Sequence, residues 1–120
     1  MPFTDADLEL IDRTKEVRIE TAKAGGPIHR TIIWVVVDGG GVFVRSAYGP
    51  DARWYREATT NPDVSLLVDG QRFEARAIQA SDEEIARMSV GLERKYAGDP
   101  ATRQMNREEL LPLTLRLEPS

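Results

Sequence analysis

TIIWVVVDGGGVFVRSAYG, residues 31–49, is the stretch of sequence that decides the fold. A β-branched apolar run leads into three consecutive glycines, Gly39 to Gly41, and a second apolar run follows them. This pattern predicts two antiparallel strands, Ile28 to Val37 and Val42 to Ala47, joined by a tight glycine turn. We expect this hairpin to form the centre of the fold.

Toward the N-terminus, the pattern predicts one more strand and one helix. Apolar and polar residues alternate from Glu16 to Thr21, which is the period of a half-exposed strand, until Ala24-Gly25-Gly26-Pro27 interrupts it. Thr4 and Asp7 have the spacing of a helix capping box, and they predict a short helix that ends near Arg13.

Toward the C-terminus, the sequence predicts a short helix and a second hairpin. Asp51 is the expected N-cap of a helix that carries Trp54 and Tyr55 and ends at Asn61-Pro62. Asp69-Gly70 is typical of a type I′ turn, and here it joins two expected strands, Val64 to Val68 and Gln71 to Ile78.

The last third of the chain is predicted to cover the core and to add a final strand. Ser81 and Glu84 form a second capping box, and apolar residues then recur at helical spacing as far as Tyr96. A helical stretch around 102–110 precedes a strand in which Leu113, Leu115 and Leu117 alternate with polar residues. The connections are too short for parallel crossovers, so we expect an α+β fold dominated by β, a six-stranded antiparallel barrel with flanking helices.

Composition limits the class of protein. The 120 residues fit one domain, 1–120, and the net charge of -4 argues against nucleic acid as a partner. There is no cysteine, which excludes disulfides and thiolate sites. The N-terminus lacks the features of a signal peptide, so we expect a cytoplasmic protein. The longest apolar run, Ile32 to Val37, is far too short to span a membrane.

The central hairpin also predicts a ligand site. If Gly39 and Gly40 are the turn, the paired residues are Thr31 with Tyr48, Arg30 with Gly49, Ile33 with Ser46, and Trp34 with Arg45. The open end then gathers two guanidinium groups, hydroxyls and glycine amides, which suit an anionic phosphate. The alternative is that Arg30 and Arg45 are solvent-facing strand residues whose stems cover apolar surface.

Aromatic residues follow this end of the hairpin. Trp54 and Tyr55 have the flat rings that cover a heterocycle, although ordinary core packing explains them equally well. Tyr48 falls in a turn, which favours a functional role. His29, the single histidine, is interpreted as structural or peripheral, and no cluster of metal ligands is present. Arg94-Lys95-Tyr96 is a weaker candidate site at the end of the long helix.

Three motifs carry a family resemblance: TIIWVVV at 31–37, VRSAYG at 44–49, and Trp54-Tyr55 followed by NPDV at 61–64. Together they resemble the deazaflavin-dependent nitroreductase-like group of the FMN-binding split-barrel superfamily. The sequence is most similar to a bacterial family, domain of unknown function 2255, and the likeness extends from Glu16 to Leu117. It has fewer cations before the second strand than the nitroreductase-like group, which leaves FMN, a deazaflavin or no cofactor open.

The resemblance implies a split barrel that binds FMN or the 8-hydroxy-5-deazaflavin coenzyme, and a homodimer. It implies hydride transfer to a small electrophilic substrate, in which no side chain need act as acid or base. A non-catalytic binding module with the same fold is the alternative function. The cofactor-binding residues expected from the hairpin and the resemblance are Arg30, Thr31, Ile33, Arg45, Ser46, Ala47, Tyr48, Gly49, Trp54 and Tyr55.

Overall fold

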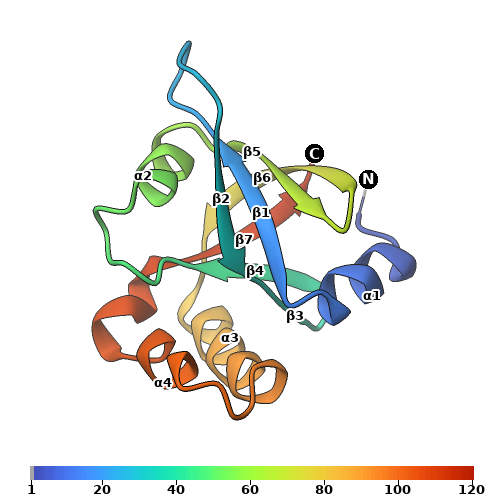
Figure 1. The fold of residues 1–120 in the computed structure, drawn as a ribbon, viewed down its shortest axis with the longest axis vertical. Coiled ribbons are helices and arrows are strands. Elements are labelled where there is room, and N and C mark those ends of the chain that lie inside the picture. Colours follow the sequence, from blue (N-terminus) through green and yellow to red (C-terminus); the bar gives the residue numbers. More distant parts are fainter. Residues whose placement is uncertain (1) are drawn as a thin grey trace.

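A computed structural model describes residues 2–120, and its strands form one curled antiparallel sheet (Figure 1). The spatial order of the strands is β2-β1-β5-β6-β7-β4-β3. Their bounds are β1 Glu16–Thr21, β2 His29–Trp34, β3 Val36–Asp38, β4 Gly41–Arg45, β5 Asp63–Val68, β6 Gln71–Gln79 and β7 Thr114–Pro119. The helices are α1 Asp5–Arg13, α2 Arg53–Thr60, α3 Asp82–Lys95, α4 Ala101–Met105 and the 3-10 helix η1 Glu108–Leu113.

Both predicted capping boxes are confirmed, at Thr4 for α1 and at Ser81 for α3. The prediction that Asp51 caps α2 is wrong. The N-cap is Ala52, which has no side-chain hydrogen bond, so α2 begins one residue later than that cap would require. The helical stretch expected around 102–110 is two elements, because α4 ends at Met105 and η1 starts at Glu108.

Both predicted turns are confirmed. Gly39 and Gly40 have positive φ angles of 56° and 82°, and Asp38 pairs with Gly41 across them. Asp69 and Gly70 have φ angles of 47° and 82°, as a type I′ turn requires. Each turn therefore sets the register of the strands that it joins.

The register predicted from the glycine turn extends over only three residue pairs, from Asp38 with Gly41 to Val36 with Phe43. Beyond them the chain leaves β4, and β2 pairs instead with β1, with Ile33 opposite Val17. The other side of β4 pairs with β7. The predicted pairs of Thr31 with Tyr48, Arg30 with Gly49, Ile33 with Ser46 and Trp34 with Arg45 are therefore wrong.

The cause lies at Val35, whose backbone bonds to helix α3 and its cap rather than to a strand. Its amide donates to Tyr96 Oη at 3.2 Å, and its carbonyl accepts from Lys95 Nζ at 2.8 Å. Because these side chains satisfy the polar groups of Val35, the segment can change strand partners there without leaving them unpaired. The single strand expected over 28–37 becomes β2 and β3, which gives seven strands rather than six.

This change of partner produces the barrel. The two edge strands of the sheet, β2 and β3, are consecutive in the chain, so the sheet curls until its edges meet at Val35. Farther along, β2 and β4 diverge and leave the barrel open on that side (Figure 1). The predicted antiparallel split barrel with flanking helices is confirmed.

Two apolar clusters hold the fold together. The larger one fills the barrel and includes Val17, Ile19, Val44 and Leu66, with Ile11 from α1 and Trp54 from α2 packed into it. The smaller one lies under α3 and joins that helix to β3 and β4. Its members are Val36, Phe43, Met88, Leu92, Tyr96 and Met105.

Within residues 2–120, none of the helices is long and apolar enough to cross a membrane.

Candidate ligand-binding cleft

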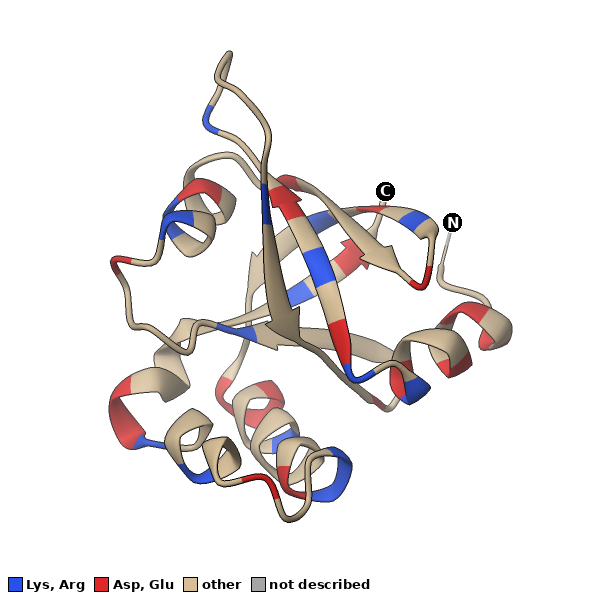
Figure 2. Cartoon of the chain, in the orientation of Figure 1, with Lys and Arg blue, Asp and Glu red and all other residues tan. Residues whose placement is uncertain are grey.

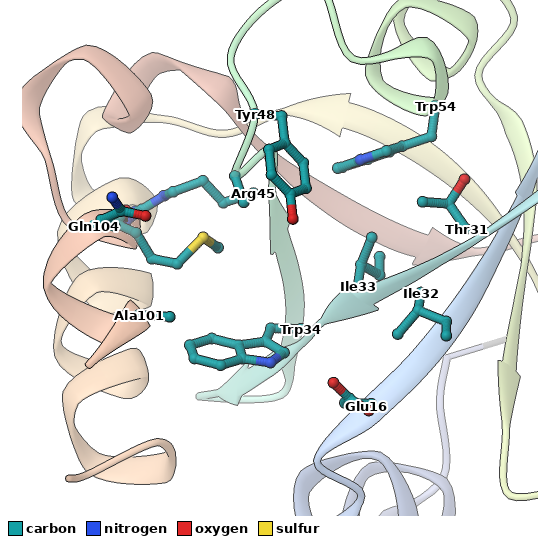
Figure 3. A pocket seen from close by; sticks show the side chains of 12 residues that line it. Glu16, Thr31, Ile32, Ile33, Trp34, Arg45, Tyr48, Trp54, Ala101 and Gln104 are labelled. Carbon is teal, nitrogen blue, oxygen red and sulfur yellow. Dashed lines mark hydrogen bonds between the residues drawn. The ribbon is translucent and has the colours of Figure 1, made fainter. Parts of the chain in front are cut away.

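A cleft of about 420 Å³ opens where β2 and β4 diverge (Figure 3). One wall is β2, the opposite wall is α4, and the loop after β4 and the start of α2 complete it. The lining residues are Glu16, Thr31, Ile32, Ile33, Trp34, Arg45, Ala47, Tyr48, Trp54, Ala101, Gln104 and Met105.

Three aromatic side chains surround the cleft. The Trp34 indole stacks on the Tyr96 ring, with centroids 3.9 Å apart and planes at 4°, so α3 holds its orientation. Trp54 is buried and meets Tyr55 edge to face at 6.0 Å. Tyr48 is 90% exposed, and Figure 3 shows its ring over the space between Arg45 and Trp54. The cleft thus offers flat apolar surfaces on more than one side.

Five of the twelve lining residues have polar side chains: Glu16, Thr31, Arg45, Tyr48 and Gln104. Thr31 contributes a hydroxyl from β2, Gln104 an amide from α4, and Glu16 an exposed carboxylate from the start of β1. Polar groups set between apolar and aromatic walls are typical of small-molecule sites, where they fix the orientation of the ligand.

Arg45 is buried, and all five of its N–H donors are used within the protein. Nε donates to Thr114 Oγ1 at 2.8 Å, and Nη1 donates to the Met105 carbonyl and to Asn106 Oδ1, both at 3.0 Å. Nη2 donates to the Ile85 carbonyl and to Ser89 Oγ, both at 3.1 Å. A guanidinium has five donors, so none remains for a phosphate.

The charge of Arg45 has no carboxylate partner among the described residues. All of its acceptors are neutral, and one is the carbonyl at the C-terminal end of α4, where the helix dipole favours a cation. Burial lowers the pKa of Arg45 to about 10, which still leaves it charged at neutral pH. The cleft wall therefore contains a buried, uncompensated positive charge.

The structure brings together six of the ten predicted site residues. Thr31, Ile33, Arg45, Ala47, Tyr48 and Trp54 line the cleft, although they come from diverging strands and not from one hairpin. Arg30, Ser46, Gly49 and Tyr55 do not line it. Arg30 lies on the outer face of the sheet and bonds Glu20, while Ser46 Oγ donates to the Gly49 carbonyl at 2.6 Å.

Sequence reasoning missed the α4 wall, which contributes Ala101, Gln104 and Met105. No motif marks these residues, because α4 reaches the cleft only through the packing of α3 against the sheet. Trp34 was detectable, because an indole on a strand beside the predicted site suggests a stacking surface. The tripeptide Arg94-Lys95-Tyr96 does not line the cleft; Lys95 and Tyr96 hold Val35 in place.

A second groove, of about 480 Å³, lies between α2 and the loop that joins β1 to β2. Its cations are Lys23, Arg53 and Arg56, and none of them takes part in an ion pair within residues 2–120. Figure 2 shows basic positions on that projecting loop and on α2. In a chain of net charge -4, this is a local concentration of free positive charge.

The floor of this groove holds a buried carboxylate, Glu57. It accepts from Thr21 Oγ1 at 2.9 Å and lies 2.9 Å from His29 Nδ1. Burial alone would raise the pKa of Glu57, but the hydrogen bonds from Thr21 and His29 and the nearby positive charges lower it. His29 is thus tied to a buried acid, consistent with its structural interpretation.

Among residues 2–120, no group of three or more His, Cys, Asp or Glu side chains is placed to hold a metal ion.

Residues 7–117 match the model of a family described as "Uncharacterized protein conserved in bacteria (DUF2255)". No curated protein sequence matches the chain.

Several solved structures share the fold. HutZ, the heme storage protein from Vibrio cholerae, is 20% identical with a TM-score of 0.72, covering 100% of this chain and 92% of its own. An F420-H2 dependent reductase is 19% identical with a TM-score of 0.69, and the match covers 86% of this chain and 93% of the reductase chain. A putative pyridoxamine 5′-phosphate oxidase from Listeria innocua is 16% identical with a TM-score of 0.70, and the match covers 97% of this chain and 92% of the oxidase chain. At these identities, the likeness establishes the split-barrel fold and not a cofactor or an activity.

Proposed function

This chain belongs to the DUF2255 family and has a split-barrel fold, and we propose that its cleft binds the ring of a flavin or deazaflavin and that the protein is an oxidoreductase. The observation that carries the proposal is the cleft between β2 and α4, with its aromatic walls and the polar groups between them. Two of the similar structures, a reductase dependent on F420-H2 and a putative pyridoxamine 5′-phosphate oxidase, are named for redox enzymes, which supports the proposal.

The cleft suits a flat heterocycle. Its volume of about 420 Å³ lies within the range of about 300–1,000 Å³ typical of small-molecule pockets. Trp34 is held flat by its stack on Tyr96, which provides a rigid surface at low entropic cost. Thr31 and Gln104 supply hydroxyl and amide groups on opposite walls that would orient the polar edge of the ring.

The phosphate of such a cofactor requires free cations, and Arg45 has none of its donors free. The neighbouring groove offers Lys23, Arg53 and Arg56. His29 of the groove and Thr31 of the cleft are two residues apart on β2, so their side chains share a face and lie about 7 Å apart. We therefore assign the ring to the cleft and the anionic tail to the groove.

The bound ring would supply the hydride chemistry, and the protein would supply position and exclusion of water. Trp34, Trp54 and Met105 exclude water from the apolar walls. The titratable groups of the lining are Glu16, Arg45 and Tyr48. Arg45 is fully engaged, and Glu16 and Tyr48 are exposed, so no side chain is held in place as a general acid or base.

The absence of a positioned acid or base among the lining residues fits a second function equally well, a non-catalytic module that holds a small molecule in the same cleft. The two functions differ in what happens after binding. An oxidoreductase exchanges electrons between its bound ring and a small electrophilic substrate, whereas a binding module retains its ligand unchanged.

We also propose that the protein is a homodimer. Strand β2 is an edge of the sheet, and two large apolar side chains on or beside it, Ile28 and Ile32, are 68% and 57% exposed. An exposed apolar edge strand is a surface that a second chain covers, most often across a twofold axis.

The experiment is a titration of the purified protein with FMN, with the 8-hydroxy-5-deazaflavin coenzyme and with hemin. Ligand fluorescence or absorbance gives the affinity, and thermal unfolding checks it, because a ligand that binds the native state must stabilise it. We expect binding of FMN or of the deazaflavin. Binding of hemin alone, or of none of the three at tens of micromolar, would contradict the proposal.

Ala101→Phe supplies the matched test of location, because it places a ring in the cleft from the start of α4. We expect it to abolish binding of the cofactor without unfolding the protein. Val90→Phe, at a position of α3 that is 66% exposed and outside the cleft, is the control and should bind as the wild type does.

A further inference from the structure

Arg45 is an unusual wall residue for a cleft. It is 1% exposed, its five donors reach three structural elements or their caps, and every acceptor is neutral. A buried charge without a counterion is costly, because water is lost and no opposite charge replaces it. Hydrogen bonds alone satisfy the donors and leave the net charge of +1 in place.

Charges on the surrounding elements do not cancel it. On β7, Arg116 is paired with Glu84 of α3 at 2.7 Å, so that pair contributes little net charge. Arg107, before η1, is paired with Glu109 at 2.6 Å, and α4 carries Arg103, which is a further cation. The carboxylate that lines the cleft, Glu16, comes from β1 on the opposite wall, and it is exposed to solvent.

We infer that Arg45 is a charge-selecting residue of the cleft: its buried guanidinium makes the cleft favour a ligand whose ring carries negative charge. This inference rests on the proposed function. The ligand class is the anionic form of the ring, either an ionised 8-hydroxy-5-deazaflavin or the anion of reduced FMN. Arg45 acts through the electrostatic potential, since it has no free donor with which to touch the ligand.

The size of the effect follows from Coulomb's law. One charge acting over roughly 10 Å at an effective dielectric constant of about 20 shifts an ionisation equilibrium by about one pH unit. Cancelling the charge of Arg45 should therefore reduce the preference for the anion about tenfold.

Asn106→Asp is the variant that cancels this charge and keeps the hydrogen bond that residue 106 accepts from Arg45. The new carboxylate oxygen replaces Asn106 Oδ1, which accepts from Arg45 Nη1 at 3.0 Å. The substitution also removes the Asn106 amide donor, which bonds the Ser89 carbonyl at 3.2 Å. Asn106→Ala is the matched control, because it loses both bonds and leaves the charge of Arg45 unchanged.

The probe is the 8-hydroxy-5-deazaflavin coenzyme, and the readout is the pKa of its ring hydroxyl, followed by absorbance when it is free and when it is bound. We expect binding to the wild type to lower this pKa, and Asn106→Asp to raise it by about one unit relative to the wild type. Asn106→Ala should keep the wild-type value. If FMN is the ligand that binds, the same comparison uses its midpoint potential, which the wild type should raise and Asn106→Asp should lower.

The outcomes separate this inference from the proposed function. Failure of both cofactors to bind the wild type rejects the proposed function and the inference with it. Binding with equal ring pKa values, or equal midpoint potentials, in the wild type and Asn106→Asp leaves the proposed function intact and shows that Arg45 is structural only. If Asn106→Asp does not fold, the wild type alone still tests the inference. A ring hydroxyl whose pKa is higher when bound to the wild type than when free would overturn it.

Discussion

The Tyr96 ring supports the Trp34 indole face to face, while its hydroxyl accepts from the Val35 amide at 3.2 Å and donates to the Lys15 carbonyl. One side chain thereby supports an aromatic wall of the cleft and the point at which the sheet changes strand partners.

Tyr96→Phe should destabilise the protein by about 1–3 kcal/mol, because it keeps the ring stack but leaves the buried Val35 amide without its acceptor. Urea unfolding measures the change. Tyr55→Phe is the control: the Tyr55 hydroxyl has no hydrogen-bond partner within residues 2–120, so that change should be within about 0.5 kcal/mol. Equal stabilities of the two variants would contradict the role of the hydroxyl.

Lys95 should make stability rise with pH in the alkaline range. Burial lowers its pKa to about 8 from the ordinary value of 10.5, so between these pH values the unfolded chain binds more protons than the folded one. The stabilising contribution is complete above pH 10.5 and is lost as the pH falls through 8. The free energy of unfolding of the wild type, relative to that of Lys95→Met, should therefore increase from pH 8 to pH 10.5. A relative stability that stays constant over this range would contradict the lowered pKa of Lys95.

Gly91→Ala should be destabilising by about 1–3 kcal/mol, because the added methyl group would collide with Cγ1 of Val36. The collision predicts rescue: Gly91→Ala combined with Val36→Ala should lose less stability than the two single changes add up to. Thermal unfolding of the three variants tests this. Additive losses would show that α3 does not approach β3 this closely.

Glu57→Gln should remove part of the acid sensitivity of the protein. Hydrogen bonds from Thr21 and His29 outweigh burial and lower the pKa of Glu57 below 4.5, so its contribution to stability is present above that pH and lost as the pH falls further. The stability of Glu57→Gln should therefore approach that of the wild type below pH 4.5. A difference in stability between Glu57→Gln and the wild type that stays the same from neutral pH to below pH 4.5 would contradict this role of Glu57.

Ile28→Glu should convert the proposed homodimer into a monomer, because it places a charge on the apolar edge beside β2. Sedimentation equilibrium measures the mass, which should fall from twice 13.4 kDa to 13.4 kDa. Val90→Glu, at a comparably exposed position on α3, should leave the dimer intact. A wild-type protein that sediments as a monomer would refute the dimer outright.

Local patterns determined most of the elements of this fold. The capping boxes at Thr4 and Ser81, and the turns at Gly39-Gly40 and Asp69-Gly70, depend on neighbouring residues only, and all four are confirmed. The type of each element follows in the same way from apolar periodicity. The sequence by itself therefore determined the helix caps, the turns and the type of each element, because these depend on residues that are close together in the chain.

Only the tertiary structure decided where the central strand breaks and which groups bind the guanidinium of Arg45. The run from Ile28 to Val37 carries no sign of a break at Val35, because the hydrogen bonds that permit it come from Lys95 and Tyr96, 60 or more residues away. The sequence predicted Arg45 at the candidate ligand site, but the burial of its guanidinium among carbonyls and side chains of α3, α4 and β7 depends on how those elements pack. Strand pairing and the solvation of a charge are set by partners that are distant in the chain, so local sequence does not fix them.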